Sequence, residues 1–160
     1  MPSIHLTNLD EPGTQTLILC PTRELCMQVA NDLRAYSKYI DKLGIVSIYG
    51  GASIEKQIKS IKKRSHIVVG TPGRTKDLLT RKKLFIDKVQ RIVLDEADEM
   101  LSMGFKDDLD FILSKITGES QKLLFSATMP KKVESIVKQY MNDPVNIAVD
   151  RVNTASVNVK

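Results

Sequence analysis

The sequence predicts an α/β fold, with a mostly parallel sheet between two layers of helices. Short apolar runs that suit buried strands alternate with segments whose apolar residues recur at helical spacing. Glycine or proline follows several of these runs, and both residues end regular structure. Because right-handed crossovers bring the carboxyl ends of parallel strands to one edge, the segments that follow the strands should meet there.

The first half of the chain should contain three strands, each followed by a helix. The expected strands are residues 16–20, 44–49 and 66–69. Thr22 and Ser53 stand where a side-chain oxygen can cap the helices that follow the first two strands. The apolar faces of the three helices are expected to be Leu25, Val29, Leu33 and Tyr36; Ile54, Ile58 and Ile61; and Leu78 and Leu79.

The second half should repeat this alternation. Strands are expected at residues 91–94, 122–125 and 145–149. A short helix is expected at residues 96–101 and a longer one at 105–116, and Pro130 suits the start of a last helix. Residues 1–15 carry weak periodicity and should be weakly structured, while the polar residues 150–160 resemble a linker.

Composition restricts the classes of protein that this chain can belong to. With 160 residues, 42% hydrophobic and 27% charged, it suits one globular domain rather than a disordered segment. No apolar run is long enough for a membrane span, and no secretory signal opens the chain. The net charge of +5 points mildly to a polyanionic partner. Two cysteines without a metal-ligand set favour free thiols and a cytoplasmic location.

Acidic and hydroxyl side chains follow two successive expected strands. Asp95, Glu96 and Asp98 come directly after the apolar run at 91–94, where carboxylates can hold Mg²⁺ and orient a water. The alternative is that they are only helix-start acids, favoured by the helix dipole. Ser126 and Thr128 follow the next strand and can hydrogen-bond a carboxylate such as Asp98, or instead cap the helix near Pro130.

Three further turns suit phosphate binding. Residues 21–24 and 71–74 each place Thr and Arg donors where a strand turns into a helix, whose free N–H groups attract phosphate. Residues 50–51 are glycines that permit close approach of the backbone to a ligand. Ordinary capped turns remain the alternative for each of them.

Each motif alone is common, but all of them in this order are highly specific for one protein family. The series Pro21-Thr22-Arg23-Glu24-Leu25, Gly50-Gly51, Thr71-Pro72-Gly73-Arg74, Asp95-Glu96-Ala97-Asp98 and Ser126-Ala127-Thr128 resembles the amino-terminal RecA-like domain of DEAD-box RNA helicases. The resemblance covers residues 16–149. It implies remodelling of RNA coupled to ATP hydrolysis, with a second RecA-like domain as partner.

The resemblance also implies roles for individual residues. Asp95 would bind Mg²⁺ through water, and Asp95 and Glu96 would serve the ATP site. The catalytic set implied is Glu96, Asp98, Ser126 and Thr128. The residues implied to grip the RNA backbone are Pro21, Thr22, Arg23, Glu24, Gly50, Gly51, Thr71, Pro72, Gly73 and Arg74.

The chain departs from the family pattern before its first expected strand. It contains no Gly-Lys dipeptide, so the phosphate-binding loop G-x-x-x-x-G-K-[ST] is absent. We therefore expect an incomplete RecA-like domain that lacks the strand carrying this loop, as in a helicase fragment without ATPase activity of its own. The missing strand should leave a gap or an exposed edge in the sheet, through which copies of the chain could associate.

Two other functions remain open at this stage. The chain could be an RNA-binding or regulatory module without ATPase activity, as the missing loop suggests. It could also belong to a DNA-directed helicase of the same superfamily, although the Asp95-Glu96-Ala97-Asp98 and Pro21-Thr22-Arg23-Glu24-Leu25 motifs favour RNA.

Overall fold

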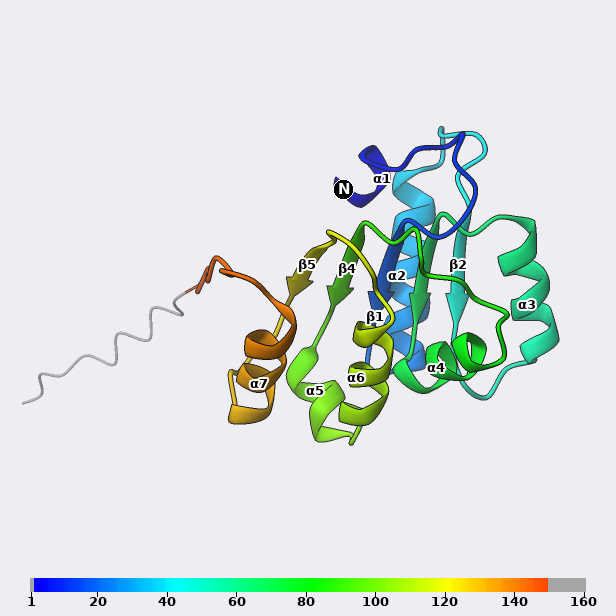
Figure 1. Ribbon diagram of the computed structural model, residues 1–160. Coiled ribbons are helices and arrows are strands. Elements are labelled where there is room, and N and C mark those ends of the chain that lie inside the picture. The colour runs from blue at the N-terminus through cyan, green and yellow to red at the C-terminus, as the bar shows by residue number, and fades with distance from the viewer. Residues whose placement is uncertain (1, 150–160) are drawn as a thin grey trace, which may run out of the picture.

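The computed structural model describes residues 2–149 and contains one sheet in which every neighbouring pair of strands is parallel. In spatial order the strands are β2 (Ile45–Ile48), β3 (Ile67–Gly70), β1 (Thr16–Leu19), β4 (Arg91–Leu94) and β5 (Gln121–Leu124). The arrows in Figure 1 all point to the same edge of the sheet. The predicted parallel sheet is confirmed, and each of these five strands lies within two residues of its expected bounds.

Helices cover both faces of the sheet, as predicted. They are α1 (Pro2–His5), α2 (Arg23–Tyr36), α3 (Ile54–Lys63), α4 (Pro72–Thr80), α5 (Ala97–Ser102), α6 (Lys106–Ser114) and α7 (Lys131–Tyr140). One hydrophobic cluster joins one face of the sheet to α3–α7, and a second joins the other face to α1 and α2. The protein therefore has three layers.

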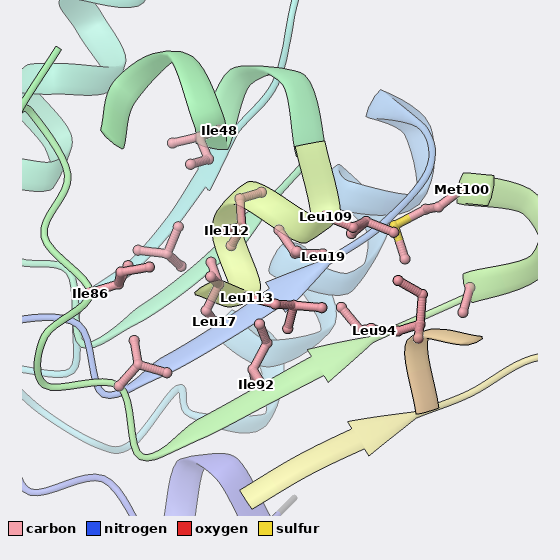
Figure 2. Packing of buried hydrophobic residues seen from close by; sticks show 14 of the residues in the cluster. Leu17, Leu19, Ile48, Ile86, Ile92, Leu94, Met100, Leu109, Ile112 and Leu113 are labelled. Carbon is pink, nitrogen blue, oxygen red and sulfur yellow. The ribbon is translucent and has the colours of Figure 1, made fainter. Parts of the chain in front are cut away.

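The two clusters meet at the central strand β1. Leu17 and Leu19 enter the larger cluster, while Ile18 and Cys20 enter the smaller one. This alternation follows from the period of two along a strand. Figure 2 shows Leu17 and Leu19 among the side chains of the larger cluster. Burial on both faces explains why the strand reads as an unbroken apolar run.

Two side-chain caps start helices at the places predicted. The Thr22 hydroxyl accepts the Leu25 N–H of α2 at 3.2 Å, and the Ser53 hydroxyl accepts the Lys56 N–H of α3 at 3.4 Å. The predicted inner face of α2 is partly wrong. The helix fully buries Cys26, Ala30 and Leu33, whereas Tyr36 is 68% exposed. Cys26 and Ala30 were overlooked because small side chains contribute little to an apolar pattern.

The last predicted strand is wrong. Residues 145–149 follow α7 without strand structure, and Val145, Ile147 and Val149 are all more than 80% exposed. A strand needs a paired neighbour to be stable. Within residues 2–149, β5 is paired only with β4, so its outer edge is open. The sequence predicted either a gap within the sheet or an exposed edge. The five strands are paired without a gap, so the exposed edge is the outcome present.

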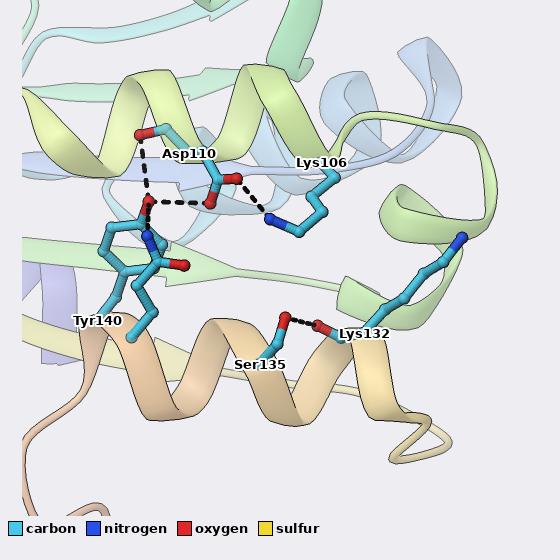
Figure 3. Close-up of polar contacts among 6 residues, drawn as sticks. Lys106, Asp110, Lys132, Ser135 and Tyr140 are labelled. Carbon is cyan, nitrogen blue, oxygen red and sulfur yellow. Dashed lines mark hydrogen bonds and ion pairs between the residues drawn. The ribbon is translucent and has the colours of Figure 1, made fainter.

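The helix after β5 is held to its neighbour by a polar cluster (Figure 3). The Tyr140 hydroxyl of α7 donates to the Asp110 carboxylate of α6 at 2.8 Å, and Lys106 pairs with the same carboxylate. Burial and the bond to Asp110 raise the pKa of Tyr140 to about 12. The protonated phenol donates the hydrogen bond that joins α7 to α6.

The segment before β1 carries more local order than its sequence suggested. It contains α1, and the buried Gln15 side chain donates to the carbonyl oxygens of Asn8 at 2.7 Å and Glu11 at 3.1 Å. No helix between residues 2 and 149 combines the length and apolarity needed to cross a membrane. The predicted linker at 150–160 lies outside the described residues.

Candidate functional site

The carboxyl ends of the strands form one edge of the sheet, and the strand order divides the candidate residues there into two groups. Asp95, Glu96, Asp98 and the 126–128 segment follow the neighbouring strands β4 and β5. The turns at 21–24, 50–51 and 71–74 follow β1, β2 and β3, which are the other three strands. We call these the acidic half and the cationic half of the carboxyl edge.

Asp95 is the partly buried member of the acidic half. Its backbone N–H donates to the Leu19 carbonyl at 2.9 Å, so the main chain is held against the central strand. Burial raises the pKa of its carboxyl, and a hydrogen bond from the Glu96 backbone opposes part of that rise. A carboxylate deprived of some of its hydration gains from a cation, which suits a metal-facing role.

Glu96 has an unusual backbone for its residue type. It occupies the left-handed region at φ 52° and ψ 53°, as the residue before α5. This conformation is costly for a side chain other than glycine, asparagine or aspartate. The carboxylate is exposed, and the turn directs the chain into α5 immediately after Asp95. Strain of this kind often occurs at functional sites.

Asp98 joins the loops after β4 and β5. Its carboxylate accepts the Thr128 hydroxyl at 2.8 Å and the Thr128 backbone N–H at 3.0 Å. Ser126 bonds differently from what was expected, because its hydroxyl accepts the Asp98 backbone N–H at 3.2 Å. Burial tends to raise the pKa of Asp98, but the hydrogen bonds that its carboxylate accepts from the Thr128 hydroxyl and backbone outweigh it and hold the pKa below its ordinary value. Neither hydroxyl caps α7.

The acidic half does not form a complete metal cage. Between residues 2 and 149 there is no group of three His, Cys, Asp or Glu side chains placed to hold a metal ion. Mg²⁺ at nucleotide sites binds through one or two carboxylates, with water and phosphate oxygens completing its shell. Asp95 and Glu96 fit that arrangement, in which the ion arrives with phosphates and is bound largely through water.

Two helix amino termini point into the cationic half. Thr22 precedes α2 and Thr71 precedes α4, and both have extended backbones. The Thr71 hydroxyl makes no capping bond. Free N–H groups of the first turn and the helix dipole favour phosphate at such positions. The amino termini of both helices are therefore candidate positions for an anion at the same edge.

Arg23 is the exposed cation of this half. Its guanidinium lies 5.0 Å from the centre of the Tyr49 ring, a cation–π distance. Gly51 has φ 76°, and a side chain added there would lie 3.9 Å from the Arg23 guanidinium. Gly51 is needed for this left-handed turn, whereas Gly50 has open space around it. The contact with Tyr49 turns Arg23 toward the glycine turn.

Gln57 connects two of the candidate segments, although no sequence motif identifies it as a site residue. Its side-chain amide donates to the Tyr49 carbonyl at 3.1 Å and accepts from the Arg74 guanidinium at 3.0 Å. The same guanidinium nitrogen lies 3.3 Å from the Ala52 carbonyl oxygen. Gln57 is only 7% exposed. One signal was present in the sequence, because this polar residue lies on the apolar face of α3, three positions after Ile54.

For the remaining candidates, the structure gives burial, exposure and backbone position rather than side-chain hydrogen bonds within the site. Pro21 and Pro72 are buried, and Pro72 occupies the first turn of α4. A side chain added at Gly73 would lie 3.7 Å from the Asp108 carboxylate, which is ordinary contact. Glu24 is exposed in the first turn of α2. The structure thus brings all the sequence candidates to one edge, although not all of them touch one another.

Known proteins resemble this chain in sequence. The sequence model of the DEAD/DEAH box helicase family matches residues 1–136. The chain is 47% identical over 150 residues to RNA helicase CrhR of Synechocystis sp., covering 94% of this chain and 30% of the relative.

Solved structures give the same result. A DEAD box protein from the hyperthermophile Methanococcus jannaschii matches with a TM-score of 0.83 and 46% identity, over 89% of this chain and 38% of that one. A hypothetical ATP-dependent RNA helicase from Sulfolobus tokodaii matches with a TM-score of 0.77 and 36% identity. This match covers 82% of this chain and 39% of that one. The predicted RecA-like fold is confirmed. The chain spans less than two fifths of the length of these three relatives.

Proposed function

This chain belongs to the DEAD/DEAH box helicase family, and from that premise we propose that it is part of an ATP-dependent RNA helicase. The observation that carries the proposal is the convergence of five separate motifs on one edge of a parallel sheet. Their order in the sheet puts the carboxylates after β4 and β5 beside the threonine and arginine turns after β1, β2 and β3, which supports a metal site next to a phosphate site. That pairing suits an enzyme that couples nucleotide hydrolysis to movement on a polyanion.

The cationic half would bind the backbone of one RNA strand. Thr22 and Thr71 would direct helix amino termini at phosphates, and Arg23 would approach from the glycine turn. Few aromatic side chains are available, at 5% of the chain, so recognition would depend on phosphate and sugar rather than on base stacking. RNA of many sequences should therefore bind.

The acidic half would serve the nucleotide. Asp95 would hold Mg²⁺ through water, and Glu96 would orient or deprotonate the attacking water. ATP would supply the phosphoanhydride that is cleaved. Because Asp98, Ser126 and Thr128 connect the loops after β4 and β5, a shift at the nucleotide would reach the β5 loop through these bonds.

We propose that RNA binding is the activity that this chain retains alone. The sequence has no Gly-Lys dipeptide, so it offers no phosphate-binding loop of the usual kind. ATP hydrolysis would require such a loop and a second RecA-like domain from other parts of the helicase. We further propose that the chain self-associates through the open edge of β5 and that the protein is cytoplasmic, which its buried free thiols support.

The test is RNA binding measured by fluorescence anisotropy at several salt concentrations. Affinity should fall steeply with salt, and Arg23→Gln should weaken binding about threefold to tenfold at low salt. Arg34→Gln is the matched control, because it removes the same charge from the other end of α2. Equal effects of the two variants would refute a dedicated site at the carboxyl edge.

One specific observation favours a second candidate, an RNA-binding module without ATPase activity: the absent phosphate-binding loop. Glu96→Gln in the whole protein separates the two. If the variant loses RNA-stimulated ATP turnover while its RNA affinity is unchanged, the helicase is supported. If the unaltered whole protein already shows no ATP turnover, the RNA-binding module is supported. A DNA strand of the same sequence should bind more weakly, and equal affinity for DNA would favour a DNA-directed enzyme.

A further inference from the structure

A basic cleft lies at the amino edge of the sheet, opposite the site described above. It has a volume of about 650 Å³, and its walls come from the segments before β1 and β3, the end of α3 and the loop after α4. Its lining includes five lysine and arginine side chains and one phenylalanine ring: Lys62, Lys63, Arg64, Lys82, Lys83 and Phe85. We call it the amino-edge cleft.

The cations of the cleft come from two separate segments and lack acidic partners. No ion pair among residues 2–149 involves any of the five. Asp10 is the single acidic residue in the lining. Lys62 and Lys63 gain some stability from the carboxyl end of α3, where cations are favoured. Lys82 and Lys83 directly follow the last turn of α4, where their backbone N–H groups bond the Leu79 and Leu78 carbonyls, so the dipole of α4 favours them in the same way.

Polar groups also line the cleft from inside the protein. Thr14, Ser65 and His66 contribute to the lining and are 2%, 7% and 2% exposed. The hydroxyl oxygens of Thr14 and Ser65 lie 3.5 Å apart. Hydroxyl groups beside clustered cations are typical donors to phosphate oxygens. The cleft therefore combines surface charge with polar groups that are held in place.

An aromatic ring faces outward beside these cations. Phe85 is 65% exposed, although its neighbours Leu84 and Ile86 are 2% and 4% exposed. The two neighbours anchor the loop in the core, so the ring between them is directed to solvent. Exposed rings next to lysines form stacking platforms for unpaired bases, because every base has a π-face.

We propose that the amino-edge cleft is a second binding site for single-stranded RNA. Lysines and Arg64 contact phosphates from two sides, and one base stacks on Phe85. An acidic protein segment would satisfy the cations, but it would cover the ring only if it also carried an apolar side chain at the right place, whereas every nucleotide joins a phosphate to a base that can stack. The site is distinct from the carboxyl edge, so a helicase of this kind would hold RNA at both edges of the same sheet.

The stacking step can be tested directly because the chain contains no tryptophan. In the Phe85→Trp variant of the full chain, the introduced indole is the sole tryptophan and reports on its surroundings. Fluorescence should be quenched by a uridine oligonucleotide of about ten residues. Quenching should persist when Arg23→Gln is added, since that change affects only the carboxyl edge. The double variant thus separates loss of RNA binding at the amino-edge cleft from loss of RNA binding at the carboxyl edge.

The charge contribution needs a matched comparison. The triple variant Lys63→Gln, Lys82→Gln, Lys83→Gln should lose about tenfold in RNA affinity at low salt, with a salt slope smaller by about two. The control triple variant Lys38→Gln, Lys115→Gln, Lys138→Gln removes equal charge outside the cleft lining and should leave the slope nearly unchanged. Thermal unfolding of both variants checks that the fold is intact.

Three results would overturn the proposal. The first is absence of quenching by RNA, and the second is an equal loss of affinity in the two triple variants. The third is quenching by a polyglutamate peptide but not by RNA, which would identify the cleft as a site for an acidic protein.

Discussion

At Glu96, an exposed carboxylate is combined with a left-handed backbone, φ 52°. Lys42, Lys82 and Asp143 share positive φ, but Glu96 is the one that sits between a sheet strand and a helix at the candidate site. Glycine would suit this backbone better. A glutamate at this position supports the proposed role of its carboxylate, because strained residues often occur at functional sites.

We predict that Glu96→Gly stabilises the fold while abolishing the proposed catalytic role. Relief of the left-handed strain should add about 1 kcal/mol to the free energy of unfolding, measured by urea denaturation. Lys42→Gly, at φ 73°, is the control and should stabilise by a similar amount. Destabilisation by Glu96→Gly would show that the carboxylate supports the fold, and the functional interpretation of the strain would then fail.

His66 gives the fold a dependence on pH. It is 2% exposed, and its Nδ1 accepts the Gly44 N–H at 3.0 Å. Burial, and then the nearby Arg64 charge, lower its pKa below the ordinary 6.5. Below pH 6.5 the unfolded chain therefore binds a proton that the folded chain resists, so stability should fall as the pH decreases.

We predict that the free energy of unfolding decreases between pH 7.5 and 5.5, with a slope of at most about 1.4 kcal/mol per pH unit from His66. His66→Gln keeps an acceptor for the Gly44 N–H and cannot titrate. The difference between the two proteins isolates this histidine from other groups. Parallel stability profiles over this range would contradict the assignment.

At the scale of elements, the sequence predicted best what depends on local chemistry. The caps at Thr22 and Ser53 appear as expected, because capping involves residues three positions apart. Strand bounds were also close, since Pro21 and the glycines at 50–51 punctuate the apolar runs. The strand expected at 145–149 failed because pairing depends on a neighbour in space, which local sequence does not specify.

Gln57 shows the same limit at the candidate site. Its role depends on Tyr49 and Arg74, which belong to two other segments of the chain. The motif residues at the carboxyl edge were found because each follows a strand. A residue that connects two motifs has no such marker, and only the fold brings its partners together.

We predict that Gln57→Leu weakens RNA binding about threefold to tenfold without lowering stability. Leucine suits the apolar face of α3 beside Ile54 and Ile58, so packing should be preserved. The Arg74 guanidinium and the Tyr49 carbonyl, which directly precedes the Gly50-Gly51 turn, would lose their common partner. Gln28→Leu on α2 is the matched control at an exposed position. Unchanged RNA affinity in Gln57→Leu would show that Gln57 has a structural role only.

At the scale of the whole molecule, sheet order explains how two chemistries share one edge. The acidic half follows β4 and β5, while the cationic half follows β1, β2 and β3. The sequence predicted that the loops would meet, but it did not give the order in which the strands lie. Only that order shows that the two halves are neighbours and that β5 is an outer strand.

The open edge of β5 leads to the last prediction. Its outer backbone groups have no strand partner within residues 2–149, and apolar side chains lie nearby: Phe125 is 56% exposed and Met129 is 49% exposed. Unpaired edges with exposed apolar residues promote pairing with another chain. We therefore expect the chain to self-associate as its concentration rises, in sedimentation velocity experiments.

A charged residue at an edge opposes such pairing, so Leu123→Lys with Phe125→Lys should keep the chain monomeric. Tyr36→Lys is the control, because Tyr36 is 68% exposed at the end of α2, which packs against β2 and β3 at the other side of the sheet. It should associate like the unaltered chain. If the unaltered chain stays monomeric at every concentration, the edge is protected in solution; if both variants associate equally, contact is made elsewhere. Association blocked only by the edge lysines would show that β5 pairs with a second chain.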